Sequence, residues 1–122
     1  MENRLNFEEK RKTPRFNLEV PVEYKQLRGS PELRKGSLTK DLCMGGTRFI
    51  TDEFLPYTAR LVLDITLPLP QRSISAVAKI SWIKRLPAGD RYEVGNQFLE
   101  ISKEDKNRLS AYLDNLNIPP RI

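Results

Sequence analysis

The sequence contains no histidine and a single cysteine, Cys43. Without histidine, the chain lacks the side chain that most often acts as a general base near neutral pH and as a metal ligand. One cysteine cannot form an internal disulfide bond and is a poor basis for a thiolate zinc site. We therefore expect neither an enzyme nor a metal site, and no cofactor.

Long apolar stretches are also missing. No run approaches the roughly 18 apolar residues that a membrane span needs, and Met1 to Arg4 do not begin an apolar signal peptide. The expectation is a cytoplasmic protein that does not insert into a membrane. A chain of 122 residues is long enough for one hydrophobic core and too short for two.

The net charge of +5 is concentrated in one part of the chain. Residues 10–40 carry nine lysine and arginine side chains against three glutamates, a local balance of +6, while the remainder nearly cancels. Such a local excess favours an anionic ligand or a nucleic-acid surface. A solvated basic surface is the simpler alternative.

Alternation of apolar and polar residues predicts about six short strands separated by glycine and proline turns. The predicted strands cover residues 18–24, 37–42, 47–51, 61–67, 74–82 and 92–99. Pro21 predicts a sheet edge or a bulge in the first strand, and Lys35-Gly36 predicts a turn. The paired glycines Gly45 and Gly46 predict a bend with backbone angles closed to other residues.

Only the end of the chain has a helical pattern. Ser102 suits an N-cap, with Asp105 three residues later in an imperfect capping box. One face of the predicted helix, at about 103–116, carries Leu109, Tyr112, Leu113 and Leu116. The elements together indicate an all-β antiparallel barrel or sandwich closed by one C-terminal helix. Trp82 is expected in its core.

Two arginines, Arg11 and Arg15, lie beside Pro14 in a segment without helical or strand period. We expect them to be displayed on a loop. A planar guanidinium can make two parallel hydrogen bonds to phosphate, or donate to O6 and N7 of guanine. By itself, this segment could equally be a disordered basic tail.

A second pattern, Asp41-x-Cys43-x-x-Gly46, follows about thirty residues later. A carboxylate such as Asp41 accepts hydrogen bonds from paired donors like N1–H and N2–H of guanine. Asp41 and Gly46 are also residue types that are common in turns. The two patterns together predict a site for a guanine nucleotide.

Both patterns, together with Val94-Gly95-Asn96-Gln97-Phe98, resemble the PilZ domain family over roughly residues 9–113. The family's motifs are RxxxR and [D/N]xSxxG. The resemblance implies a six-stranded antiparallel β-barrel with a C-terminal helix that acts as a receptor for cyclic di-GMP. On this basis, residues 1–9 are a flexible arm, residues 10–117 are the PilZ domain and residues 118–122 are a tail.

The resemblance also implies a role for each motif residue. Arg11 and Arg15 would clamp the phosphates and guanine edges, and Asp41 would bind a guanine edge. Cys43 would take the place of the family's serine, and Gly46 would let the backbone approach the base. Further candidates are Lys10, Lys12 and Gly45. In the family, the ligand draws the arm across the barrel, and a partner protein reads this change.

Cys43 departs from the family pattern because a thiol is larger than a hydroxyl and a weaker hydrogen-bond donor. The loss of one ordinary hydrogen bond costs about 0.5–1.5 kcal/mol, or roughly three- to tenfold in affinity. A redox-sensitive thiol is an alternative, although the chain offers no resolving cysteine.

Three classes of function remain open. The first is a single-domain cyclic di-GMP receptor, monomer or homodimer, that signals to an unidentified effector protein. The second is a PilZ-like module that binds a protein and no nucleotide. The third is a basic barrel for single-stranded nucleic acid, which needs exposed aromatic residues among basic ones. Only Phe49 beside Arg48 offers that pattern. We favour the three classes in this order.

Overall fold

A computed structural model of the chain describes residues 17–28, 34–68 and 71–116. The predicted arm and tail, at residues 1–9 and 118–122, lie outside the described residues. So do four of the candidate site residues, Lys10, Arg11, Lys12 and Arg15.

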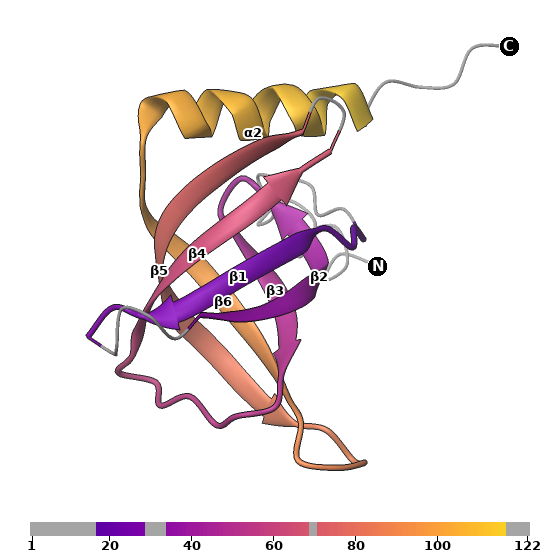
Figure 1. The fold of residues 1–122 in the computed structure, drawn as a ribbon, viewed down its shortest axis with the longest axis vertical. Helices are drawn as coiled ribbons and strands as arrows, with labels where there is room; N and C mark the ends of the chain where they lie inside the picture. Colours follow the sequence, from indigo (N-terminus) through magenta and orange to yellow (C-terminus); the bar gives the residue numbers. More distant parts are fainter. Residues whose placement is uncertain (1–16, 29–33, 69–70, 117–122) are drawn as a thin grey trace, which may run out of the picture.

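In the described residues, six antiparallel strands form a closed barrel (Figure 1). The strands are β1 (Pro21–Gln26), β2 (Lys35–Cys43), β3 (Gly46–Thr51), β4 (Arg60–Leu67), β5 (Arg72–Arg85) and β6 (Tyr92–Ile101). Their order around the barrel is β1-β2-β3-β6-β5-β4, and β4 pairs with β1 to close it. The prediction of a six-stranded antiparallel barrel is confirmed, and the sandwich is excluded.

One helix, α2 (Lys103–Leu116), lies across one end of the barrel, at the top of Figure 1. The Oγ of Ser102 accepts a hydrogen bond from the backbone N–H of Asp105 at 3.0 Å, which confirms the predicted N-cap. The Asp105 carboxylate in turn accepts a hydrogen bond from the Ser75 backbone N–H on β5 at 2.9 Å. The helix start is thereby tied to the barrel. No helix in the described ranges is long and apolar enough to cross a membrane.

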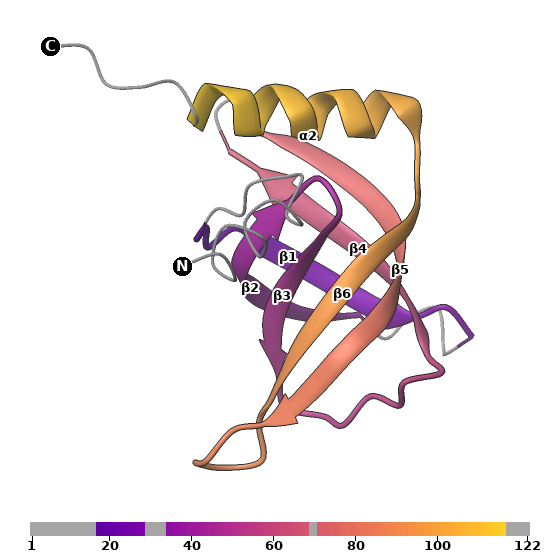
Figure 2. The same ribbon diagram turned by 180° about the vertical axis from the view of Figure 1, so that it is seen from behind.

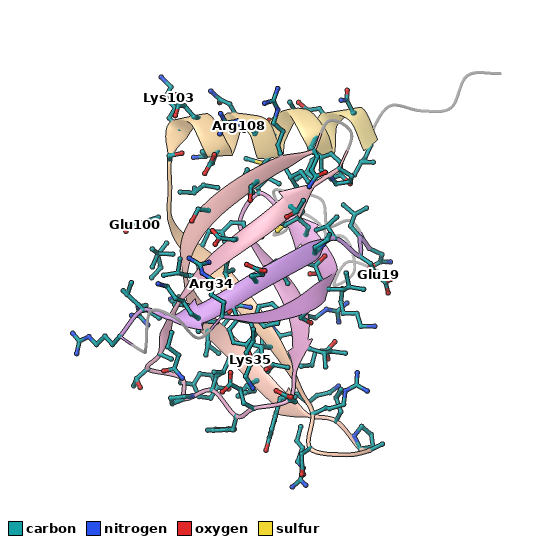
Figure 3. All side chains as sticks on the ribbon, in the orientation of Figure 1. Glu19, Arg34, Lys35, Glu100, Lys103 and Arg108 are labelled. Atoms are coloured by element: carbon teal, nitrogen blue, oxygen red, sulfur yellow. The ribbon has the colours of Figure 1, made fainter. Side chains whose placement is uncertain are left out.

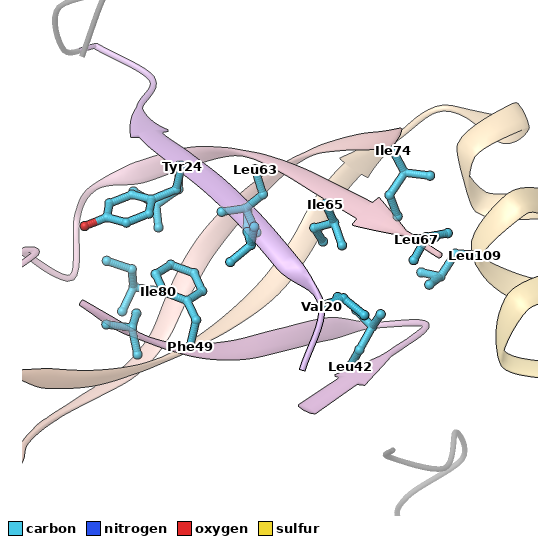
Figure 4. Close-up of a cluster of buried hydrophobic side chains, with 14 of the residues drawn as sticks. Val20, Tyr24, Leu42, Phe49, Leu63, Ile65, Leu67, Ile74, Ile80 and Leu109 are labelled. Carbon is cyan, nitrogen blue, oxygen red and sulfur yellow. The ribbon is translucent and has the colours of Figure 1, made fainter. Parts of the chain in front are cut away.

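The core fills the barrel and extends under the helix. Tyr24 and Phe49 stack near one end with ring centroids 5.0 Å apart. At the other end, Leu109 of α2 lies beside Leu67 (Figure 4). The alternating strands supply most of this cluster, which is why strand periodicity could be recognised in the sequence. Burial raises the pKa of Tyr24, so its hydroxyl stays protonated and donates to Glu53 Oε2 at 2.8 Å.

Two turn and edge predictions are wrong. Pro21 is not at a sheet edge, because β1 pairs with both β2 and β4. It is tolerated as the first residue of the strand, where the ladder with β4 has not yet begun. Lys35 and Gly36 are not a turn: they begin β2 and pair with Tyr24 and Glu23 of β1.

The prediction that Trp82 lies in the core is also wrong. The register of β5 against β6 shifts between Ile80 and Trp82, which breaks the alternation and leaves the indole half-buried. It lies over Gly95, where an added Cβ would be 2.4 Å from two indole atoms. Gly95 follows the inward-facing Val94, so Trp82 covers the outer face of the barrel and not its core.

Gly46 is required by close approach and not by unusual backbone angles. Among the described glycines only Gly89 has a positive φ, of 74°, so the angles expected at Gly45 and Gly46 are not found. A Cβ on Gly46 would lie 2.0 Å from the Asn96 carbonyl oxygen, whereas a Cβ on Gly45 would meet nothing within 4 Å. The absent side chain therefore lets β3 pair closely with β6.

We predict that Gly46→Ala destabilises the barrel by about 1–3 kcal/mol, because the clashing atom is rigid backbone. Gly45→Ala is the matched control, and its stability should stay within about 1 kcal/mol of the wild type. Urea unfolding followed by tryptophan fluorescence measures both. Equal stability of the two variants would contradict the packing argument.

Candidate functional site

The turn between β2 and β3 brings together the four candidate residues that the structure describes. Asp41 and Cys43 lie at the end of β2, Gly45 is in the turn, and Gly46 begins β3. Cys43 is a free, half-buried thiol that pairs with Gly46 across the two strands. Seen from behind, this hairpin lies next to β6 (Figure 2).

A β-bulge points Asp41 away from the core. Thr39 pairs with Phe49, but Asp41 pairs with Arg48, so Lys40 is an additional residue in β2. Without the shift, Asp41 would alternate to the same inward face as Thr39. The shift places Asp41 opposite the outward-facing Arg48, and Leu42 then returns to the core.

The segment before β1 is anchored at the same bulge. The Thr39 hydroxyl donates to the Leu18 carbonyl and accepts a hydrogen bond from the Val20 N–H at 3.0 Å. The Thr39 N–H donates to the Val20 carbonyl, also at 3.0 Å. Chain that enters the barrel from the N-terminal side is thus bound to β2 two residues from Asp41.

Asp41 belongs to an ionic cluster that spans three strands. Arg48 Nε on β3 lies 3.3 Å from Asp41 Oδ2, and Arg48 Nη1 lies 3.1 Å from Glu93 Oε2 on β6. The side chains of Asp41 and Glu93 are only 9% and 14% exposed, against 32% for Arg48. Both carboxylates are therefore largely shielded from solvent.

The outer face continues past this cluster. Arg48 pairs with Gly95 on β6, and Gly95 pairs with Trp82 on β5. A carboxylate, a guanidinium, a glycine and an indole therefore follow one another across four neighbouring strands. Such a row offers an acceptor for paired N–H donors, a cation, and an aromatic boundary.

Arg48, Glu93 and Trp82 were not identified as site residues from the sequence. Arg48 was noted only for the nucleic-acid alternative, and Trp82 was assigned to the core. Their place on the same outer face as Asp41 depends on two register shifts and on the pairing of β3 with β6. The sequence held one signal for Glu93: it precedes Val94, an apolar position of the predicted strand, so alternation places it on the outer face.

Two basic residues of the charge-rich stretch pair with carboxylates elsewhere on the barrel. Arg34 forms an ion pair with Asp64. Lys35 Nζ lies 3.0 Å from Asp52 Oδ1, and this hydrogen-bonded contact raises the pKa of Lys35 and lowers the pKa of Asp52. Figure 3 shows Arg34 and Lys35 near β1 and β2, away from Lys103 and Arg108 on α2. Part of the charge excess of residues 10–40 is therefore offset by carboxylates from outside that stretch.

Comparison with known proteins identifies the fold. The family model of the PilZ domain matches residues 9–115, and no curated protein sequence matches the chain. The Bacillus subtilis inhibitor of motility MotI/DgrA is similar, with a TM-score of 0.74 and 22% identity over 90% of this chain and 53% of that one. Escherichia coli YcgR in complex with cyclic di-GMP is also similar, with a TM-score of 0.68 and 15% identity over 88% of this chain and 46% of that one.

The PilZ domain of Escherichia coli YcgR with cyclic di-GMP gives a TM-score of 0.66 at 15% identity, over 88% of this chain and 91% of that one. The chain thus spans about half the length of MotI/DgrA and of the longer YcgR chain. At these identities the likeness shows the fold. Since the family match covers most of the sequence and the barrel with its terminal helix has this same fold, the chain belongs to the PilZ domain family.

Proposed function

We propose that the protein is a non-enzymatic receptor for cyclic di-GMP that signals to a partner protein. The observation that carries this proposal is the position of Asp41, which the bulge places on the outer face beside the anchored segment before β1. Two of the similar structures, both of YcgR, are complexes with cyclic di-GMP.

Chain connectivity limits how far the arginine motif can extend from the anchored segment. Arg15 precedes Leu18 by three residues, so an extended chain can separate their Cα atoms by only about 10 Å. Leu18 is itself bound to Thr39, two residues from Asp41. Arg11 is tethered by four further residues. Both guanidinium groups can therefore reach a ligand that contacts Asp41.

Each group has a chemical role in this proposal. The Asp41 carboxylate accepts hydrogen bonds from a guanine edge, while Arg11 and Arg15 contact the phosphates and guanine edges. Cys43 and Gly46 lie against the base, with Lys10, Lys12 and Gly45 as additional contacts. Ligand binding orders the arm, within a domain of residues 10–117, and the ordered arm is what the partner recognises.

The two alternatives receive less support. Phe49, the aromatic residue on which the nucleic-acid alternative depended, is fully buried, and Arg48 faces two carboxylates. Neither is displayed for base stacking. A module that binds only protein would not require an aspartate turned outward by a bulge.

Isothermal titration calorimetry with cyclic di-GMP tests the proposal. We expect a Kd in the micromolar range or tighter, and a loss of about tenfold or more in Asp41→Ala and Arg15→Ala, because each removes charge-assisted hydrogen bonds. Asp64→Ala and Arg85→Ala make the same changes on other parts of the barrel and should bind as the wild type does. The absence of heat from the wild type at high protein concentration would refute the proposal.

Cys43→Ser tests the position of the thiol in the same assay. We expect an affinity equal to that of the wild type or up to about tenfold tighter, because a hydroxyl is the better hydrogen-bond donor. A large loss of affinity would show that Cys43 does not take the place of a ligand-binding serine.

A further inference from the structure

Arg48 is shared between two carboxylates on the outer face of the barrel. Its guanidinium lies 3.3 Å from Asp41 on one side and 3.1 Å from Glu93 on the other. Within this group of three side chains, one cation thus faces two anions. Because Asp41 and Glu93 are largely shielded from solvent, their charges are only partly screened by water.

The contact between Arg48 and Asp41 is electrostatic and not a well-aligned hydrogen bond. Arg48 Nε is buried and makes no hydrogen bond to the described part of the chain, although Asp41 Oδ2 is 3.3 Å away. Arg48 therefore compensates the charge of Asp41 without a well-aligned N–H bond from Nε to that carboxylate.

We infer that Arg48 and Glu93 set the affinity of the site for an anionic ligand. Arg48 is a positioning residue that orients Asp41 and offsets its charge, while Glu93 holds Arg48 and adds a negative charge that opposes anion binding. The inference rests on the proposed function, because it concerns a ligand with two phosphodiester charges. Neither residue belongs to the motifs that nominated the site.

Two isosteric variants should change the affinity in opposite directions. Glu93→Gln keeps an acceptor for Arg48 and removes one negative charge, so cyclic di-GMP should bind about two- to fivefold more tightly, as expected for a unit charge about 10 Å away. Arg48→Gln removes the cation that lies between the two carboxylates, and binding should weaken by about fivefold or more.

The salt dependence separates this electrostatic role from a structural one. Titrations at low and high NaCl should show a steeper loss of affinity with salt in Glu93→Gln than in the wild type, and a shallower loss in Arg48→Gln. Damage to the fold would lower affinity without changing this slope. If thermal unfolding shows that Arg48→Gln is unstable, Arg48→Lys replaces it. That variant should retain the wild-type slope and bind with intermediate affinity.

Asp90→Asn is the matched control. It removes the same charge as Glu93→Gln, but the Asp90 side chain is 90% exposed in the loop between β5 and β6. Its affinity should equal that of the wild type. A gain equal to that of Glu93→Gln would show an effect of net charge alone and would overturn the assignment of Glu93.

The possible failures are distinguishable. A wild-type protein that does not bind cyclic di-GMP overturns the proposed function and this inference with it. A wild-type protein that binds, with no gain in Glu93→Gln or with the wild-type salt slope in Arg48→Gln, overturns this inference alone.

Discussion

A single additional residue in β2 decides which way the candidate site faces. Thr39 and Asp41 would share the inward face of a regular strand, and a carboxylate there would enter an apolar core at a high cost in solvation. The bulge at Lys40 leaves Thr39 inside, where its hydroxyl binds the chain that leads into β1, and turns Asp41 outward. The barrel thereby anchors the incoming N-terminal segment and turns the Asp41 carboxylate to its outer side at one place.

Two glycines allow the strands next to this bulge to form one continuous surface. Gly46 brings β3 against the backbone of β6, and Gly95 leaves room for the indole of Trp82 against β6. Any larger residue at either position would push apart elements that have to meet. These contacts join β2, β3, β6 and β5 into the outer face that carries Asp41, Arg48 and Trp82.

Most of the fold could be predicted from local patterns. In the strand at Arg60–Leu67, buried and more exposed residues alternate without a break. Ser102 predicts the start of the helix as its N-cap, and Leu109 belongs to its apolar face. Asp41, Cys43 and Gly46 could be nominated by their spacing. The orientation of Asp41 and the positions of Arg48, Glu93 and Trp82 could not, because they depend on register shifts between strands distant in sequence.

Pairing between strands that are distant in sequence also explains the wrong predictions for Pro21 and Trp82. Pro21 read as an edge residue because its missing N–H is costly within a ladder, yet as the first residue of β1 it has no such cost. Trp82 read as core because alternation was extended through a bulge that the sequence does not mark. Local propensity predicts the elements, while pairing between distant strands determines which side chains share a face.

The central claim is that the outer face of β2, β3 and β6 binds cyclic di-GMP. Chemical-shift mapping in ¹H–¹⁵N NMR spectra of the full chain tests it most directly. We expect titration with cyclic di-GMP to shift the amides of Asp41, Gly46, Arg48 and Gly95, and to leave those of Lys35 and Asp52 at the opposite end of the hairpin unchanged. Shifts confined to that opposite end, or no shifts at saturating ligand, would contradict it.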